Sequence, residues 1–204
     1  MIEEYLKKQK TRLAALRAEM EKLPSGDYVL ELGCGHGHFL SALAERDKNA
    51  GIERNYIGVD KKTDRLRRGK KKSDRAGVPI HWIKADVADV LQLWPTTAEN
   101  KKIKEIFVLF PDPWPKKKQM KHRFVNQEFL SALGKIVGSG SRFYFRSDHK
   151  GYCAAVRELL GKSADWQIDE NIPWPRDMPT TVFEGYHRVY ENIAARRKPY
   201  ANAR

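Results

Sequence analysis

The chain has 204 residues, 41% of them hydrophobic, which is enough to form one globular domain with its own core and excludes a disordered chain. Its formal net charge is +13, concentrated in Lys61–Arg75, Pro115–Arg123 and Arg196–Arg204, which carry +7, +5 and +4 and leave −3 for the rest. Such concentrated charge favours a polyanionic partner, above all nucleic acid, although a solvated basic face without a partner is the alternative.

Hydrophobic periodicity predicts one long helix followed by alternating strands and helices. Apolar residues recur at helical spacing among charged ones over residues 2–22, and the Pro-Ser-Gly sequence that starts at Pro24 ends that helix. The short apolar runs that predict strands are residues 28–32, 56–60, 80–86, 103–110 and 141–148. The intervening segments that predict helices are residues 37–47, 62–75, 87–94, 124–137 and 149–161.

This alternation predicts an α/β fold with a mostly parallel central sheet and helices on both faces. Residues 166–172 and 182–197 predict two further strands, which we expect to form an antiparallel pair at one edge of the sheet. We expect the N-terminal helix to occupy residues 1–24 and a single domain to occupy residues 25–204.

Cysteine content and hydropathy exclude other classes of protein. Cys34 and Cys153 are the only cysteines, so neither a disulfide framework nor a zinc site is predicted. His36 and His38 have no third ligand near them in the sequence, so we expect no metal. No apolar run reaches the roughly 18 residues of a membrane helix, and the first 22 residues lack the apolar core of a signal peptide. We therefore expect a cytoplasmic protein without a membrane partner, a monomer in the first instance and a homodimer as the alternative.

Acidic side chains follow the predicted parallel strands where each strand ends. In an open parallel sheet, ligands bind outside these carboxyl ends, so acids repeated there favour a shared cleft over five separate helix caps. The acids are Glu31, Asp60, Asp86, Asp112 and Asp148.

A glycine loop, Gly33-x-Gly35-x-Gly37, directly follows the first of these strands. Glycine permits a tight turn and a close approach of the backbone to a ligand. The spacing differs from the dinucleotide fingerprint GxGxxG, which would place its third glycine at His38. Glu31 would repel a pyrophosphate, whereas it could attract an ammonium group.

A ligand with an amino-acid end and an adenosine end fits these residues, and S-adenosylmethionine is such a ligand. Asp60 is placed to accept hydrogen bonds from both ribose hydroxyls, and Asp86 from the adenine amino group. The glycine loop with Glu31, Asp60 and Asp86 therefore predicts a cofactor site for S-adenosylmethionine.

The segments ELGCGHG, GVD, KADVADVL, FPDPWPKKK, SD and TVFE occur in this order between about residues 28 and 184. Together they resemble the bacterial tRNA (guanine-N7-)-methyltransferase family, with FPDPWxK as the specific motif. The resemblance implies a Rossmann-like class I methyltransferase fold, S-adenosylmethionine as cofactor and tRNA as partner. It also implies tRNA (guanine(46)-N7)-methyltransferase activity, which methylates N7 of a variable-loop guanine.

The resemblance carries roles over to individual positions of this sequence. Glu31, Asp60 and Asp86 match the family's cofactor carboxylates, and Asp112 matches a catalytic acid that also borders the cofactor. The residues that match the substrate side are Lys116, Asp148, Thr181 and Glu184. This chain departs from the family pattern at Gln119, Met120, His122, Val182 and Gly185, all in the substrate half.

Guanine N7 has an in-plane lone pair and no proton, so its methylation needs alignment rather than a general base. A fixed carboxylate at Asp112, between two prolines, would favour the charge that moves from sulfur onto the purine. Trp114 is a candidate for stacking on the base, although core packing is the alternative. The cations predicted to hold phosphates are Lys116, Lys117, Lys118, Lys121 and Arg123. The 61–75 run is either a general tRNA-binding face or a solvated helix.

Three other functions stay open at this point. An amino-group methyltransferase carries two prolines between its acid or amide and its aromatic residue, whereas one proline separates Asp112 from Trp114. A nicotinamide-dependent oxidoreductase is disfavoured by the glycine spacing. A non-catalytic RNA-binding relic of the fold is disfavoured by the intact cofactor carboxylates.

Overall fold

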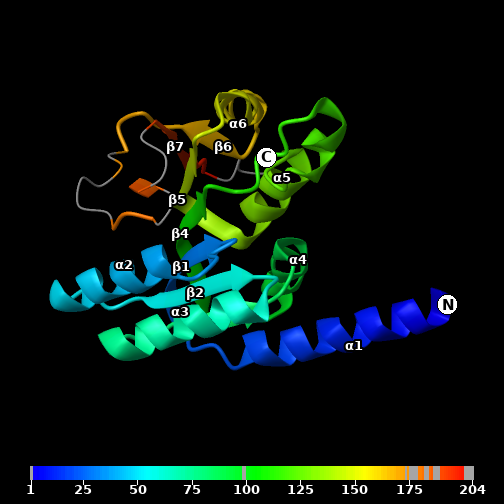
Figure 1. Cartoon of the computed structure of the whole chain (residues 1–204), viewed down its shortest axis with the longest axis vertical. Helices are drawn as coiled ribbons and strands as arrows, with labels where there is room; N and C mark the ends of the chain where they lie inside the picture. The colour runs from blue at the N-terminus through cyan, green and yellow to red at the C-terminus, as the bar shows by residue number, and fades with distance from the viewer. Residues whose placement is uncertain are drawn as a thin grey trace.

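The computed structural model describes residues 2–97, 100–172, 174, 179–181, 184–185 and 189–199. Seven strands form one sheet in the order β3-β2-β1-β4-β5-β7-β6 (Figure 1). The first five strands in sequence are parallel to one another, and β7 is antiparallel to both β5 and β6. The strands are β1 (Gly26–Leu32), β2 (Asn55–Asp60), β3 (His81–Lys84), β4 (Lys101–Leu109), β5 (Val137–Ser147), β6 (Trp166–Ile168) and β7 (Glu191–Arg197).

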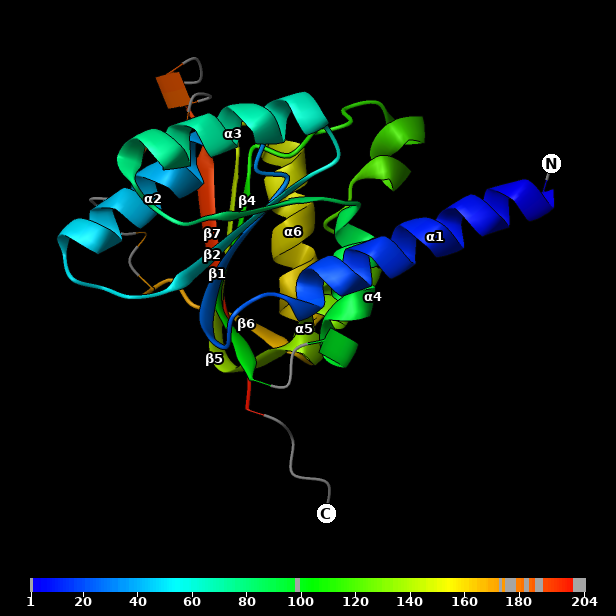
Figure 2. The same cartoon turned by 90° about the horizontal axis from the view of Figure 1, so that it is seen from below.

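Helices cover both faces of this sheet, as the sequence predicts. Figure 2 shows α2 and α3 on one face and α1, α4, α5 and α6 on the other. The helices are α1 (Ile2–Glu21), α2 (His38–Asn49), α3 (Thr63–Ala76), α4 (Val87–Thr97), α5 (Gln127–Ile136) and α6 (Lys150–Lys162), with a 3-10 segment η1 (Lys117–His122). In the described part of the chain, no helix combines the length and the apolar character that crossing a membrane requires.

Each face of the sheet has its own hydrophobic cluster, because successive side chains of a strand point to opposite faces. In β1, Leu30 and Leu32 face the cluster that α1, α4, α5 and α6 complete, whereas Val29 faces α2. Leu16 and Met20 of α1 are buried in the first of these clusters. The C-terminal end of α1 is therefore part of the same core as the sheet.

The antiparallel edge pair is confirmed, but both of its strands are shorter than predicted: β6 ends at Ile168, whereas the sequence predicts a strand to residue 172. β7 begins at Glu191, whereas the sequence predicts a strand from residue 182. Among the described residues of that stretch, Glu184 and Gly185 lie in a helical turn that Thr181 caps. A side chain that caps a helical turn satisfies the backbone in a way that competes with strand pairing.

Buried charges at the amino side of the sheet are paired with one another. Asp47 of α2 is fully buried and accepts hydrogen bonds from Arg46, Arg54 and the hydroxyl of Tyr56. Burial alone would raise the pKa of the Asp47 carboxyl, but these three donors hold it below its usual value. Arg54 also pairs with Glu105 of β4 at 2.8 Å. This network joins α2 to β4 and leaves the opposite, carboxyl edge of the sheet free for ligands.

Trp82 of β3 fills the space next to three glycines, Gly37, Gly58 and Gly69. A Cβ atom placed on Gly58 would lie 2.5 Å from the Trp82 ring, and one placed on Gly37 would lie 2.3 Å from it. The indole N–H donates to the hydroxyl of Ser73 at 3.2 Å. The ring therefore packs between β2, α3 and the start of α2. This packing fixes the position of the glycine loop relative to the sheet.

We predict that Gly58→Ala lowers the free energy of unfolding by about 1–3 kcal/mol, because the added methyl group overpacks the site against Trp82. Urea unfolding followed by circular dichroism measures this. Gly161→Ala is the control, since its Cβ would meet nothing within 4 Å and it lies in α6, where alanine is the better helix former. Equal free energies for Gly58→Ala and wild type would contradict the packing described here.

Candidate active site

The glycine loop lies between β1 and α2 and has the backbone conformation that its sequence predicts. Gly33, Gly35 and Gly37 have φ values of 77°, 53° and 63°, in the left-handed region that favours glycine. The amide of Gly33 donates to the carbonyl of Val59 in the neighbouring strand β2 at 2.9 Å. The amide of Gly35 donates to the Asp60 carboxylate at 3.0 Å. The loop is therefore held against the carboxyl end of β2.

Glu31 is a buried carboxylate beneath this loop, with only 5% of its surface exposed. The pKa of Glu31 is raised to about 8, mainly by burial; a backbone N–H at Leu40 acts in the opposite direction and the charge of Asp60 adds to the rise. Its Oε2 atom has no hydrogen-bond partner within the described residues. A buried acceptor of this kind costs about 1–3 kcal/mol unless a ligand satisfies it. An ammonium group would satisfy the atom and the charge together.

Asp60 is also buried, at the end of β2. One carboxylate oxygen accepts the amide of Gly35, and the other accepts the amide of Lys62 at 2.8 Å. The guanidinium of Arg65 lies 3.6 Å from the first oxygen. Each oxygen keeps a second lone pair, so the fixed carboxylate can accept two hydroxyl donors from a ligand.

Asp86 follows β3 and is less buried than Glu31 and Asp60. Its side chain accepts the amide of Ala88 at 3.2 Å, in the first turn of α4, and pairs with Lys61 at 2.6 Å. Burial works to raise its pKa, but the bonds from Lys61 and Ala88 hold the pKa below its usual value. Asp86 thus caps a helix at the same sheet edge, and its contact with an adenine amino group stays a prediction.

The segment after β4 that contains Asp112 has an unusual backbone. Phe110 and Trp114 have φ values of 48° and 41°, which are rare for bulky residues and cost on the order of 1–3 kcal/mol each. The rings of Pro111 and Pro113 fix the φ angles of the residues on either side of Asp112. Asp112 is exposed at the centre of this segment, beyond the carboxyl end of β4, the strand next to β1.

Two buried arginines hold this strained segment at its two ends. The amide of Phe110 donates to the carbonyl of Arg146 at 2.8 Å, and the Nε of Arg123 donates to the carbonyl of Pro113 at 2.7 Å. Arg123 is 5% exposed, and its guanidinium lies 4.5 Å from the centre of the Tyr152 ring. The structure corrects the prediction that Arg123 holds a phosphate, because its donors are turned into the protein.

The other predicted substrate cations lie on the surface. Lys116, Lys117, Lys118 and Lys121 are exposed, and the last three belong to η1. Trp114 is half-buried, and its ring lies against His122 of η1 with 5.2 Å between ring centres. That contact anchors the lysine-bearing segment next to Asp112, whereas stacking of Trp114 on a base stays a prediction.

Thr181 and Glu184 form a reciprocal capping box. The amide of Glu184 donates to the Thr181 hydroxyl at 3.3 Å, and the amide of Thr181 donates to the Glu184 carboxylate at 3.1 Å. The same carboxylate oxygen pairs with the buried guanidinium of Arg146. These contacts give Thr181 and Glu184 a structural role, and their substrate contacts stay predictions. Val182 lies outside the described residues.

Arg146, at the end of β5, is the site residue that the sequence prediction missed. Its guanidinium lies 4.1 Å from the Trp174 ring centre and 4.6 Å from that of Tyr190. Burial lowers its pKa, and the charge of Glu184 opposes that shift. The signal in the sequence is a cation that directly follows three aromatic residues at the carboxyl end of β5. Asp148, two residues further on, is exposed at the same end of the sheet.

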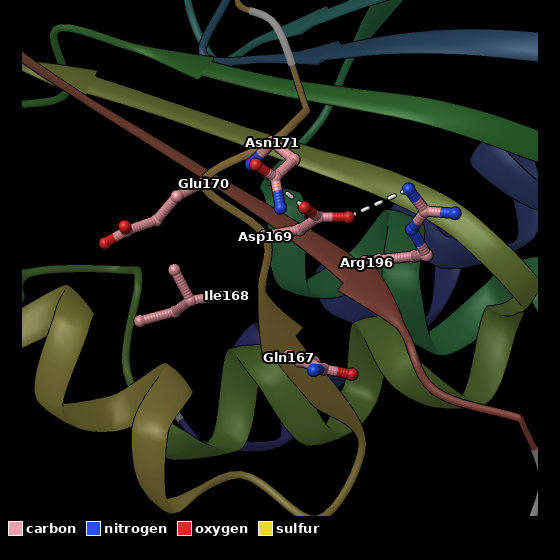
Figure 3. A pocket seen from close by; sticks show the side chains of 6 residues that line it. All are labelled: Gln167, Ile168, Asp169, Glu170, Asn171 and Arg196. Atoms are coloured by element: carbon pink, nitrogen blue, oxygen red, sulfur yellow. Dashed lines mark hydrogen bonds and ion pairs between the residues drawn. The ribbon is translucent and has the colours of Figure 1, made fainter.

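A surface hollow at the β6–β7 edge is separate from these residues (Figure 3). It is lined by Gln167 to Asn171 and by Arg196, and the Asp169 carboxylate within it pairs with Arg196 at 2.8 Å. Strand β6 is at the end of the sheet opposite β3, four places from β1. Because it lies away from the glycine loop and from the carboxylates of β1 and β2, this hollow is not the candidate site. In the described ranges, no three His, Cys, Asp or Glu side chains gather as metal ligands.

The strand order, the glycine loop and the carboxylates at one sheet edge define a Rossmann-like methyltransferase. Residues 25–198 match the family described as "Putative methyltransferase", and the chain belongs to that family. A SAM-dependent O-methyltransferase from Thermotoga maritima superposes with a TM-score of 0.55 at 15% identity, over 95% of this chain and 67% of that one. This likeness supports the fold.

Two relatives share sequence over most of the chain. The tRNA (guanine-N(7)-)-methyltransferase of Syntrophotalea carbinolica is 29% identical over 79% of this chain and 67% of its own length. The protein of the same name from Rubrobacter xylanophilus is 26% identical over 79% of this chain and 70% of its own length. The chain thus aligns with about two thirds of each relative.

We predict that Glu31 makes the ligand-free protein less stable as the pH rises. Its folded pKa of about 8 exceeds the ordinary value of 4.5, so its contribution to stability is complete below about pH 4.5 and is lost as the pH passes 8. Between pH 5 and 8.5 the loss should be on the order of a few kcal/mol. Glu31→Gln should remove this part of the pH dependence, as measured by urea unfolding at each pH. Parallel curves for the variant and wild type would contradict the assignment.

Proposed function

We propose that this protein is a tRNA (guanine(46)-N7)-methyltransferase that uses S-adenosylmethionine. The observation that carries the proposal is the strained Pro111–Asp112–Pro113 segment. It projects a carboxylate from the sheet edge that holds Glu31 and Asp60, and exposed lysines follow it directly. The two relatives described above bear the name of this activity and align over this part of the chain.

The residues of the glycine loop fit S-adenosylmethionine. Its ammonium group would satisfy the unpartnered Oε2 of Glu31, and its ribose hydroxyls would meet the fixed carboxylate of Asp60. The left-handed glycines leave no side chain between the backbone and the ligand. When bound, this cofactor supplies a methyl group on a positively charged sulfur.

The protein's contribution to the reaction is position and charge. Guanine N7 carries a lone pair and no proton, so none of the residues around Asp112 has to act as a base. Asp112 stabilises the positive charge that develops on the purine, and it is effective because its backbone is already fixed before the substrate binds. The bonds from Arg123 and to Arg146 maintain that fixed backbone.

Exposed lysines serve the tRNA rather than the chemistry. Lys116, Lys117, Lys118 and Lys121 lie on the segment that Trp114 and His122 tie to the Asp112 loop. Cations at that place would hold phosphates next to the target base. The reaction on tRNA belongs in the cytoplasm, and a monomer contains every residue named here.

The function is tested by incubating the protein with labelled S-adenosylmethionine and unmodified tRNA and mapping the labelled nucleoside. We predict 7-methylguanosine from the variable loop. Asp112→Ala should lower kcat by about a hundredfold, with a smaller effect on cofactor affinity, because a fixed charge is lost from the transition state. Glu158→Gln, an exposed acid on α6, is the matched control. Label on an exocyclic amine would instead identify an amino-group methyltransferase.

We also predict that cofactor binding releases a proton from Glu31. At pH 7 a carboxyl with a pKa of about 8 is mostly protonated, and an ammonium group next to it favours the ionised form. Calorimetry of S-adenosylmethionine binding in buffers of different ionisation enthalpy should report close to one proton released at pH 7. Glu31→Gln should bind more weakly and release none. Equal proton release by both proteins would show that the ammonium group binds elsewhere.

A further inference from the structure

We infer that one flank of α3 is a second RNA-binding surface, which contacts backbone phosphates outside the Asp112 region. The residues of this α3 stripe are Arg65, Arg68, Lys72 and Arg75. The inference rests on the proposed function, since it assumes that the polyanion is the tRNA substrate.

Helical geometry separates the α3 stripe from the rest of the helix. Leu66, Gly69 and Ser73 are the buried residues of α3 and mark the side that faces the sheet. At 100° per residue, the four side chains of the α3 stripe lie within about 80° of one another, from one border of that buried side round to the solvent side of the helix. Arg67 and Lys70 lie along the opposite border.

The two borders differ in how their charges are compensated. Arg67 pairs with Asp64 at 3.3 Å and Lys70 pairs with Asp74 at 2.8 Å, so the charges of these two cations are compensated. Across the part of the chain that the structure describes, Arg68 and Arg75 have no carboxylate within ion-pairing distance. Uncompensated like charges on one side of a helix repel one another and favour a polyanion next to them.

The α3 stripe runs along the rim of the glycine loop. The ammonium of Lys72 donates to the carbonyl of His36 at 3.0 Å, and Arg65 lies 3.6 Å from Asp60. Burial lowers the pKa of His36, and the nearby charges of Arg68, Lys72 and Arg65 lower it further, which places these cations around the loop. Phosphates held here would therefore border the cofactor site itself.

The shape of the α3 stripe fits a chain of phosphates. Its four cations are spread over about 15 Å of helix, whereas one free phosphate needs donors that converge on a point. In Figure 2 α3 and the segment that carries η1 both lie toward the top of the view, and Figure 1 shows that they are at opposite ends of the long axis of the molecule. An RNA whose guanine reaches Asp112 can thus extend its backbone over both basic surfaces.

The test compares two double variants with the same loss of charge on the same helix. Arg68→Gln/Arg75→Gln removes uncompensated cations of the α3 stripe, and Arg67→Gln/Lys70→Gln removes paired cations of the other border. Binding to unmodified tRNA is measured by fluorescence anisotropy from 50 to 300 mM salt. We expect about tenfold weaker binding for the first variant at 0.1 M salt, and a salt slope smaller by about 1.5, because two phosphate contacts are lost. The second variant should bind nearly as wild type.

Circular dichroism and S-adenosylmethionine binding establish that both variants are folded. Equal affinities and salt slopes for the two variants would overturn the inference, because net charge alone would then govern binding. Methyl transfer by the wild type is measured separately. tRNA binding that depends on the α3 stripe without any methyl transfer would overturn the proposed function and support the surface.

Discussion

The Asp112 segment depends on two hydrogen bonds to its main chain, one with the carbonyl of Arg146 and one with the side chain of Arg123. Phe110 and Trp114 adopt left-handed conformations that an isolated peptide would leave. The carbonyl of Arg146 accepts from one end of the segment and the guanidinium of Arg123 donates to the other. Both arginines are nearly inaccessible to water, so these bonds face little competition from it. A carboxylate that acts through its position needs such support, because a mobile acid would have to be ordered again in each transition state.

Asp47 and Glu105 at the amino edge of the sheet differ from Glu31 at the carboxyl edge in how fully their buried carboxyl groups are partnered. At the amino side, Asp47 and Glu105 are matched by Arg46, Arg54 and Arg142, and the network serves stability. At the carboxyl side, Glu31 is buried with one oxygen unpartnered among the described residues. A protein side chain that donated a hydrogen bond to that oxygen would stabilise the fold, but it would occupy the place of the ligand. The unpartnered oxygen of this buried carboxyl is therefore the mark of a binding site.

Local patterns in the sequence predict most of this arrangement. The alternation of apolar runs predicts the parallel sheet, and the glycine spacing after β1 predicts the loop beneath which Glu31 and Asp60 lie. Arg123 shows where such prediction fails: it stands in a run of surface lysines, and only the fold brings it against Tyr152 and Pro113. The helical turn at Glu184 was readable, because Thr181 and Glu184 have the spacing of a capping box. The apolar and aromatic residues of 182–197 favour a strand instead, so the two local patterns conflict.

Arg146 alone connects the C-terminal segment, through its side chain, to the Asp112 loop, through its carbonyl. Its side chain binds Glu184 and Asn192 and lies between Trp174 and Tyr190, all of which come from the chain after β6. Its carbonyl accepts the amide of Phe110, whose ring in turn packs edge-on against Tyr190. The contacts of Arg146 come from residues about 28 to 46 positions away, so no local pattern reports them. A displacement of the turn at Glu184 would have to repack Arg146, and with it the residue that starts the strained segment.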